Sequence, residues 1–265
     1  MMRSVLLLIS FAGVLAAQWD DVPIRIPRLP NGKPNLSAPA PRTADGKPDL
    51  SGVWLFASAV AEGDQHTQMD PNTQPFLNLA GKIPKDAVVL RPAAAALLEQ
   101  RGAGQGKDLP LSRCLPVGEP MSYTIPAPTK IIQTPDLILM LHEEVNSFRQ
   151  IFLDGRKLPV DPVHTWIGYS VGRWEGDTLV VESSGFNDKT WLDGFGHPHT
   201  EAMRLTERIH RTNAGHLDIQ ITINDPEAYE KPWTAGVGLE LRTGEEPIEK
   251  VCLENERDVA HLVGQ

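Results

Sequence analysis

A period of two dominates the second half of the chain, from Ile131 onward. In residues 217–223, Leu or Ile occupies every second position, and Asp, Gln and Thr occupy the positions between them. Alternation of this kind puts the apolar side chains on one face of a half-buried β-strand. The pattern therefore predicts a protein built mainly from β-sheet.

The alternating segments follow one another as hairpins with short polar turns between them. The expected pairs are 137–143 with 148–153, 165–174 with 178–183, 203–211 with 217–223, and 237–242 with 248–253. Residues 50–57 precede them as the first core strand. Because a long antiparallel meander normally closes to hide its edge strands, we predict an all-β, up-and-down barrel.

One segment before the hairpins predicts a helix. Residues 92–101 begin with Pro92, continue with Ala and Leu, and are followed by Gly102. Pro in the first turn and Gly just after the last turn are the expected boundaries of a helix. We therefore expect one short helix before the core hairpins, and we consider a second one at residues 254–263.

The chain divides into three parts. Residues 1–17 predict a secretory signal peptide, because Arg3 precedes a mainly apolar stretch that ends in small residues suited to cleavage. Residues 18–50 form a Pro-rich, extended arm that contains one turn sequence twice, at 31–37 and 45–51. Residues 51–265 form the barrel domain. The mature protein is expected in the periplasm or outside the cell.

The chain contains two cysteines, Cys114 and Cys252. Export into an oxidising compartment makes a disulfide possible, and two cysteines are the smallest set that can form one. We predict that they are paired. The bond would tie the end of the barrel domain back to the region before its hairpins.

Charge and missing motifs exclude several functions. The formal net charge is −9 and the basic residues form no long run, which disfavours nucleic acid and anionic membranes as partners. After the signal, no stretch reaches the roughly 18 apolar residues of a membrane span. The sequence also lacks the fingerprints of serine hydrolases, nucleotide-binding proteins and thiol oxidoreductases. A small-molecule ligand or substrate is the expected partner.

Short motifs carry two resemblances. Gly52-Val53-Trp54, on the first strand of an exported barrel, is similar to the Gly-x-Trp motif of lipocalins and related calycins. This resemblance implies a lipocalin-like barrel. The segments DGKPDLSGVW, GRWEGDTLVVESSGF, HTEAMRLTER and CLENERD resemble a family of exported, β-rich bacterial proteins. That second resemblance covers most of the mature chain and implies no particular activity.

The loop of residues 184–202, after the central hairpin, shows neither a helix nor a strand period. It contains a group of polar side chains: Asn187, Asp188, Asp193, His197, His199 and Glu201. Long polar loops on a rigid scaffold commonly carry function. We therefore take this loop as the candidate site.

Three interpretations of the loop stay open. If residues 197–201 are extended, His197, His199 and Glu201 share one face and could hold Zn²⁺ or Fe²⁺. Without a metal ion, His199 is the candidate general base, and Glu201 is its partner or the acid. In the third interpretation, hydrogen bonds from His and Asp side chains only hold the loop in shape.

Four more residues are candidates for contact with a substrate. Trp191 could stack on a ligand ring, and Asp193 and Arg204 could bind polar groups. His164 lies on the connection 154–165, which is expected at the same end of the barrel as the loop. Arg204 belongs to a polar strand face, and such a face is expected to lie toward solvent rather than toward the lumen.

These observations lead to three hypotheses of different kinds. The first is an enzyme that uses the loop for acid-base hydrolysis or elimination on a small polar or sugar-like molecule. The second is a lipocalin-like protein that binds a small ligand without chemistry. The third is a structural module of the cell envelope, in which the arm is a spacer.

Overall fold

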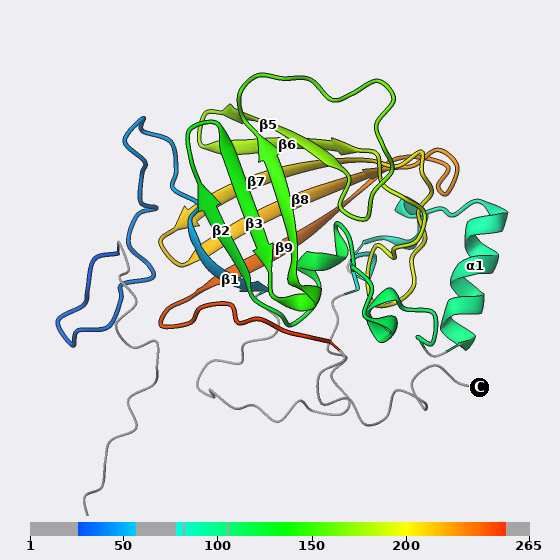
Figure 1. Ribbon diagram of the computed structural model, residues 1–265, viewed down its shortest axis with the longest axis horizontal. Coiled ribbons are helices and arrows are strands. Elements are labelled where there is room, and N and C mark those ends of the chain that lie inside the picture. Colours follow the sequence, from blue (N-terminus) through cyan, green and yellow to red (C-terminus); the bar gives the residue numbers. More distant parts are fainter. Residues whose placement is uncertain (1–25, 57–77, 82, 105, 253–265) are drawn as a thin grey trace, which may run out of the picture.

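The computed structural model describes residues 26–56, 78–81, 83–104 and 106–252 (Figure 1). The expected signal peptide at 1–17 and the expected helix at 254–263 lie outside the described residues. Within them, the fold is mostly β, with one short α-helix. No described helix has the length and apolar character that crossing a bilayer requires.

Nine strands form one closed barrel in the order of the sequence. Their bounds are β1 (Gly52–Phe56), β2 (Thr129–Gln133), β3 (Leu137–His142), β4 (Ser147–Phe152), β5 (Tyr169–Glu175), β6 (Thr178–Ser184), β7 (Arg204–Asn213), β8 (His216–Asn224) and β9 (Trp233–Arg242). Pairing of β1 with β9 closes the sheet, as Figure 1 shows. The predicted all-β barrel is therefore confirmed, and closure removes the exposed edges that an open meander would have.

One connection departs from an up-and-down meander. β4 and β5 run parallel and pair over a short stretch, Ile151 with Ser170 and Phe152 with Val171. All other neighbouring strands are antiparallel. The connection 153–168 is therefore a crossover, because a parallel pair cannot be joined by a tight turn.

Side chains fill the barrel interior. Along β7, Leu205, Glu207 and Ile209 are buried, whereas Arg204 and Arg208 on the other face are exposed. Large apolar residues from the other strands complete the core: Trp54, Met140, Ile151, Leu179, Val181, Ile219, Ile221 and Val237. The alternation read from the sequence thus sets which face of each strand lies inside.

Packing explains the Gly-x-Trp motif of β1. Gly52 has a φ of +147°, and a Cβ added there would lie 2.5 Å from Cδ1 of Leu241 on β9. Trp54, two residues further on, is 1% exposed and donates its indole N–H to the carbonyl of Leu50. The positive φ, together with the close approach of Leu241, therefore favours glycine where the first and last strands close the barrel.

The connection from β1 to β2 contains the α-helix and a segment that enters the barrel. α1 (Pro92–Ala103) begins with Pro at its first turn, and the predicted helix is confirmed. Residues 117–125, here called the plug segment, are all buried. Tyr123 of this segment reaches the interior, where its hydroxyl donates a 2.8 Å hydrogen bond to Glu207.

The C-terminal part of the described chain differs from the prediction in one respect. Residues 248–252 form no strand, so the expected hairpin with β9 is wrong. This segment instead lies against the β3–β4 connection, where Ile248 N–H donates to Glu143 and Asn146 donates to the carbonyl of Lys250. Polar contacts to a neighbouring turn replace the ladder that alternation alone suggested.

The predicted disulfide is confirmed. Cys114 and Cys252 form a bond that links positions 138 residues apart in the sequence. It fastens the C-terminal segment to the connection that precedes the plug segment. A disulfide of this kind suggests an oxidising compartment.

Candidate functional site

Two long connections meet at one end of the barrel, as the sequence predicted. The N–H of Thr165 donates to the carbonyl of Gly185 at 2.8 Å, and the N–H of Asn187 donates to the carbonyl of Thr165 at the same distance. These bonds join the crossover 153–168 to the loop 185–203. His164 consequently lies beside this loop, with its Nδ1 at 3.3 Å from Oε2 of Glu201.

His199 and Glu201 do not form the expected pair. His199 is 3% exposed, and its Nε2 lies 2.5 Å from the hydroxyl of Thr190. Burial lowers the pKa of His199 below its ordinary value, so the ring is neutral at neutral pH. Glu201 is exposed and pairs with His164 instead. The two side chains therefore serve different contacts.

The loop does contain a histidine and a carboxylate in contact, but they are His197 and Asp193. Nδ1 of His197 lies 2.8 Å from Oδ2 of Asp193. Asp193 is fully buried and also accepts hydrogen bonds from the backbone N–H groups of Leu79 and Phe195, each at 3.0 Å. A carboxylate on Nδ1 orients the imidazole and fixes its tautomer. The spacing of four residues was the only sequence signal for this pair.

The three expected metal ligands point to different partners. His197 contacts Asp193, His199 contacts Thr190, and Glu201 contacts His164. Across the residues that the structure describes, no three His, Cys, Asp or Glu side chains are grouped to hold a metal ion. The Zn²⁺ or Fe²⁺ set considered from the sequence is therefore not assembled, because residues 197–201 form no strand and the three side chains contact separate partners.

Two of the expected substrate contacts are used otherwise. Trp191 is 2% exposed, and the guanidinium carbon of Arg101 lies 4.9 Å from the centre of its ring. One face of Trp191 is thus taken by the protein's own cation. Arg204 is exposed on the outer face of β7, outside the lumen.

The outer faces of the strands carry the ion pairs that the polar alternation suggested. One of them involves His216 on β8, which lies 2.6 Å from Glu240 and 3.1 Å from Asp218. Although burial alone would lower its pKa, the two carboxylates raise the pKa of His216 above the ordinary value of 6.5.

We expect this pair of contacts to make stability depend on pH. A raised folded-state pKa contributes stability that is fully present below about pH 6.5 and is lost as the pH rises through the folded pKa. Replacing His216 by Gln should therefore reduce the fall in Tm between about pH 6 and about pH 8. An identical fall in Tm for the variant and the wild type would contradict this assignment.

The interior holds a buried ionic cluster that the sequence analysis missed. Arg149 on β4 and Glu207 on β7 form a salt bridge, with exposures of 1% and 0%. The remaining N–H groups of Arg149 bond Tyr123, Ser170 and Ser183 at 2.9–3.0 Å. Burial alone would lower the pKa of the Arg149 guanidinium, but Glu207 and Tyr123 raise it well above its usual value. Arg149 therefore remains charged inside the barrel.

A second pair extends this cluster toward the plug segment. Oε1 of Glu119 lies 3.2 Å from Nε2 of His142 and 3.8 Å from the guanidinium of Arg149. Burial opposes ionisation of Glu119, yet Arg149, His142 and Ser122 together lower its pKa. The cluster thus connects the plug segment to five strands of the barrel, β3 to β7.

The sequence did contain a signal for this cluster. Glu207 lies on the apolar face of its strand, together with Leu205 and Ile209. Arg149 alternates in the same way with Ile151. A charged residue on a buried face is rarely found without a partner.

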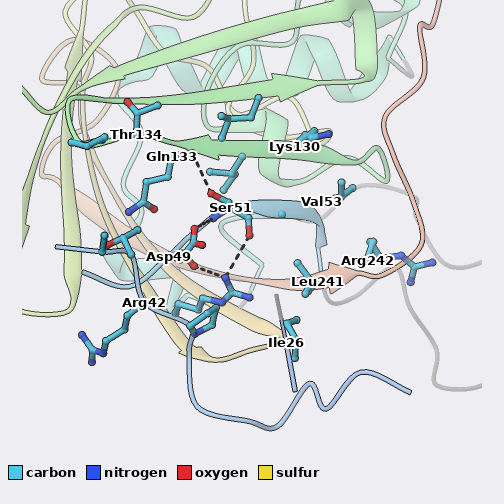
Figure 2. Close-up of a pocket in the computed structure, with 18 of the residues that line it drawn as sticks. Ile26, Arg42, Asp49, Ser51, Val53, Lys130, Gln133, Thr134, Leu241 and Arg242 are labelled. Atoms are coloured by element: carbon cyan, nitrogen blue, oxygen red, sulfur yellow. Dashed lines mark hydrogen bonds between the residues drawn. The ribbon is translucent and has the colours of Figure 1, made fainter. Parts of the chain in front are cut away.

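A pocket of about 830 Å³ lies at the other end of the barrel. It opens where β1 begins and where β2 and β9 end, and one wall is the arm that precedes β1 (Figure 2). Its apolar lining includes Ile26, Val53, Ile131, Trp174 and Leu241. Its polar lining includes Arg42, Asp49, Lys130, Gln133, Arg211 and Arg242. The size and the mainly apolar lining are typical of small-molecule sites.

Several polar residues of this pocket hold the arm in place. Gln133 accepts from the N–H of Leu50 at 2.8 Å and donates to the carbonyl of Pro48 at 3.1 Å. Arg211 is 3% exposed and donates to the carbonyl of Asp49. Burial lowers the pKa of Arg211 to about 10. The pocket wall is therefore fixed by partly buried hydrogen bonds.

No protein-family model, no curated protein and no solved structure matches the chain.

Proposed function

We propose that this barrel binds a small, largely apolar molecule in the pocket at the end where β1 begins. The observation that carries the proposal is the volume of about 830 Å³, with apolar side chains from the barrel on one side and the arm on the other. Pockets of roughly 300–1,000 Å³ with this kind of lining bury most of a small ligand's surface.

The lining favours an amphipathic molecule. Trp174 and Leu241 offer apolar contact area, and Ile26 continues this surface onto the arm. The charged groups around them balance, since Lys130 pairs with Glu246 and Arg242 pairs with Glu245. A ligand whose apolar body meets the barrel and whose polar end meets this rim fits such a lining better than a strongly charged one.

A pocket-filling substitution tests the proposal. Titration of the purified protein with 1-anilinonaphthalene-8-sulfonate and with laurate, followed by Trp fluorescence, should show saturable binding of one molecule per chain. Ala44→Trp, on the exposed part of the arm that lines the pocket, should weaken binding by about tenfold or more. Ala95→Trp, on the exposed face of α1, is the matched control and should bind as the wild type does. Equal affinities for the two variants would contradict this location.

A second candidate function is acid-base catalysis at the loop 185–203. Its support is the contact between His197 and Asp193, which resembles the orientation of a general base by a buried carboxylate. The role expected for His199 then passes to His197. In a screen of chromogenic glycosides and esters, His197→Gln should abolish any turnover while His199→Gln retains it. Turnover that survives His197→Gln would exclude this site.

The proposal includes export of the protein out of the cytoplasm. The disulfide between Cys114 and Cys252 supports maturation in an oxidising compartment. The apolar start of the sequence supports delivery there by a cleaved signal. Sequencing the N-terminus of the protein purified from its native host should find cleavage after Ala16 or Ala17.

A further inference from the structure

The arm contains the same turn twice. Residues 27–37, the first copy, read PRLPNGKPNLS, and residues 41–51, the second copy, read PRTADGKPDLS. In both copies the N–H at the third position donates to the carbonyl at the seventh, at 2.8 and 2.9 Å. In both, the Arg donates to the carbonyl of the turn glycine at 2.8 Å, and that glycine has a φ near +80°. Two nearly identical sequences thus give two copies of one structure.

The second copy shows what this structure can bind. Arg42 makes a two-bond contact with the carboxylate of Asp177, with distances of 2.9 and 2.6 Å. Asp177 lies in the tight turn between β5 and β6. The hydrogen bond from Arg42 lowers the pKa of Asp177, and Lys47 contributes to the same effect. The second copy is therefore a frame that presents an Arg fork and a Lys to an acidic turn.

The first copy has the same frame without the partner. Within the described residues, no carboxylate lies within 4.0 Å of the guanidinium of Arg28, whose own turn bond is nevertheless intact. Leu29 and Leu36 are 41% and 38% exposed. The two aspartates of the second copy, Asp45 and Asp49, are replaced by asparagines.

The two copies also differ in net charge. With Arg28 and Lys33 and no acidic residue, the first copy is basic, although the whole chain carries a net charge of −9. In the second copy, Arg42 and Lys47 are balanced by aspartates. A basic frame attracts acidic groups of a partner protein.

We propose that the first copy is an interaction surface that binds an aspartate-bearing β-turn of an acidic partner protein. Arg28 forms the two-bond contact with the aspartate, and Lys33 adds charge beside it. Leu29 supplies the apolar edge. This contact between two proteins has the same form as the two-bond contact that Arg42 makes with Asp177 within one chain.

A cyclised hairpin peptide that copies residues 172–181 provides the probe, because it contains the turn that the second copy binds. Addition of this peptide to the full protein should shift the amide NMR signals of residues 27–37 in a saturable way. Arg28→Ala should weaken binding by about fivefold or more, and Arg28→Lys should also weaken it, because Lys cannot form two parallel bonds. Arg113→Ala, an exposed arginine elsewhere, is the matched control.

Two outcomes would overturn the proposal. One is the absence of shifts in residues 27–37 at saturating peptide. The other is equal binding of a peptide in which the aspartate is replaced by asparagine, or of a scrambled peptide of equal charge.

A second measurement uses the protein alone: Arg42→Ala frees Asp177, so that variant should dimerise through Arg28 of another molecule. The double variant Arg28→Ala/Arg42→Ala should stay monomeric, and a dimer of the double variant would also contradict the proposal.

Discussion

Replacement of Glu207 by Gln should lower the free energy of unfolding by about 3 kcal/mol. The substitution leaves the guanidinium of Arg149, which is 1% exposed, inside the barrel without its main counter-charge. Breaking a buried pair typically costs about 3–5 kcal/mol, and the lower figure applies because Glu119 remains 3.8 Å from Arg149. Chemical denaturation followed by Trp fluorescence measures the change.

An exposed pair provides the control for this prediction. Glu182 lies 2.8 Å from Arg173 on the outer face of the barrel, where both side chains are about half exposed. Glu182→Gln makes the same chemical change and should alter the free energy of unfolding by less than about 1 kcal/mol. If both variants lost a similar free energy of unfolding, burial of the Glu207 pair would not explain the loss. A smaller loss for Arg149→Met/Glu207→Leu than for Glu207→Gln would support unpaired charge as the cause.

Removal of the disulfide should lower the free energy of unfolding by a similar or larger amount. In the chain-entropy model, a bond between residues 138 apart restricts the unfolded chain by about 5 kcal/mol, and measured effects are commonly about 2–5 kcal/mol. The double variant Cys114→Ser/Cys252→Ser should therefore unfold at a clearly lower denaturant concentration than the oxidised protein. The double variant avoids a free thiol.

The same substitution should also release the C-terminal segment. Few other contacts hold it, among them the pair of Lys250 with Glu144 and the bonds between Asn146 and the backbone of Lys250. Limited proteolysis should cut the variant after Lys250 well before the barrel is digested. The oxidised wild type, treated in parallel, should resist this cut, and equal cutting rates would show that the bond does not restrain the segment.

The barrel could be predicted because strand formation depends on local pattern. In β8, Leu217, Ile219 and Ile221 alternate with polar residues, and this period already decides which side chains are buried. The parallel pairing of β4 with β5 could not be predicted in this way. Nothing in residues 153–168 distinguishes a crossover from a long hairpin loop, because the direction of a strand is set by where its partner lies.

The candidate site was likewise predicted only in part. The sequence indicated that His164 lies beside the loop of residues 184–202, and the contact of His164 with Glu201 bears this out. It did not indicate that His199 turns to Thr190 or that Asp193 orients His197. Side-chain partners in a loop without a period depend on packing against other elements, here α1 and the segment around Leu79.

The sequence by itself determined eight of the nine strands, all but β2, together with the helix, the disulfide partners and the duplicated turn. Periodicity and the positions of Pro and Gly act locally, and a pair of cysteines leaves no alternative partner. Tertiary structure alone decided the buried pair of Arg149 with Glu207 and the pocket beside the arm. These features join residues from distant strands, and closure of the barrel fixes their positions. Whether a charge is buried and which side chains line a cavity depend on the neighbouring residues in space, and the order of residues does not specify these neighbours.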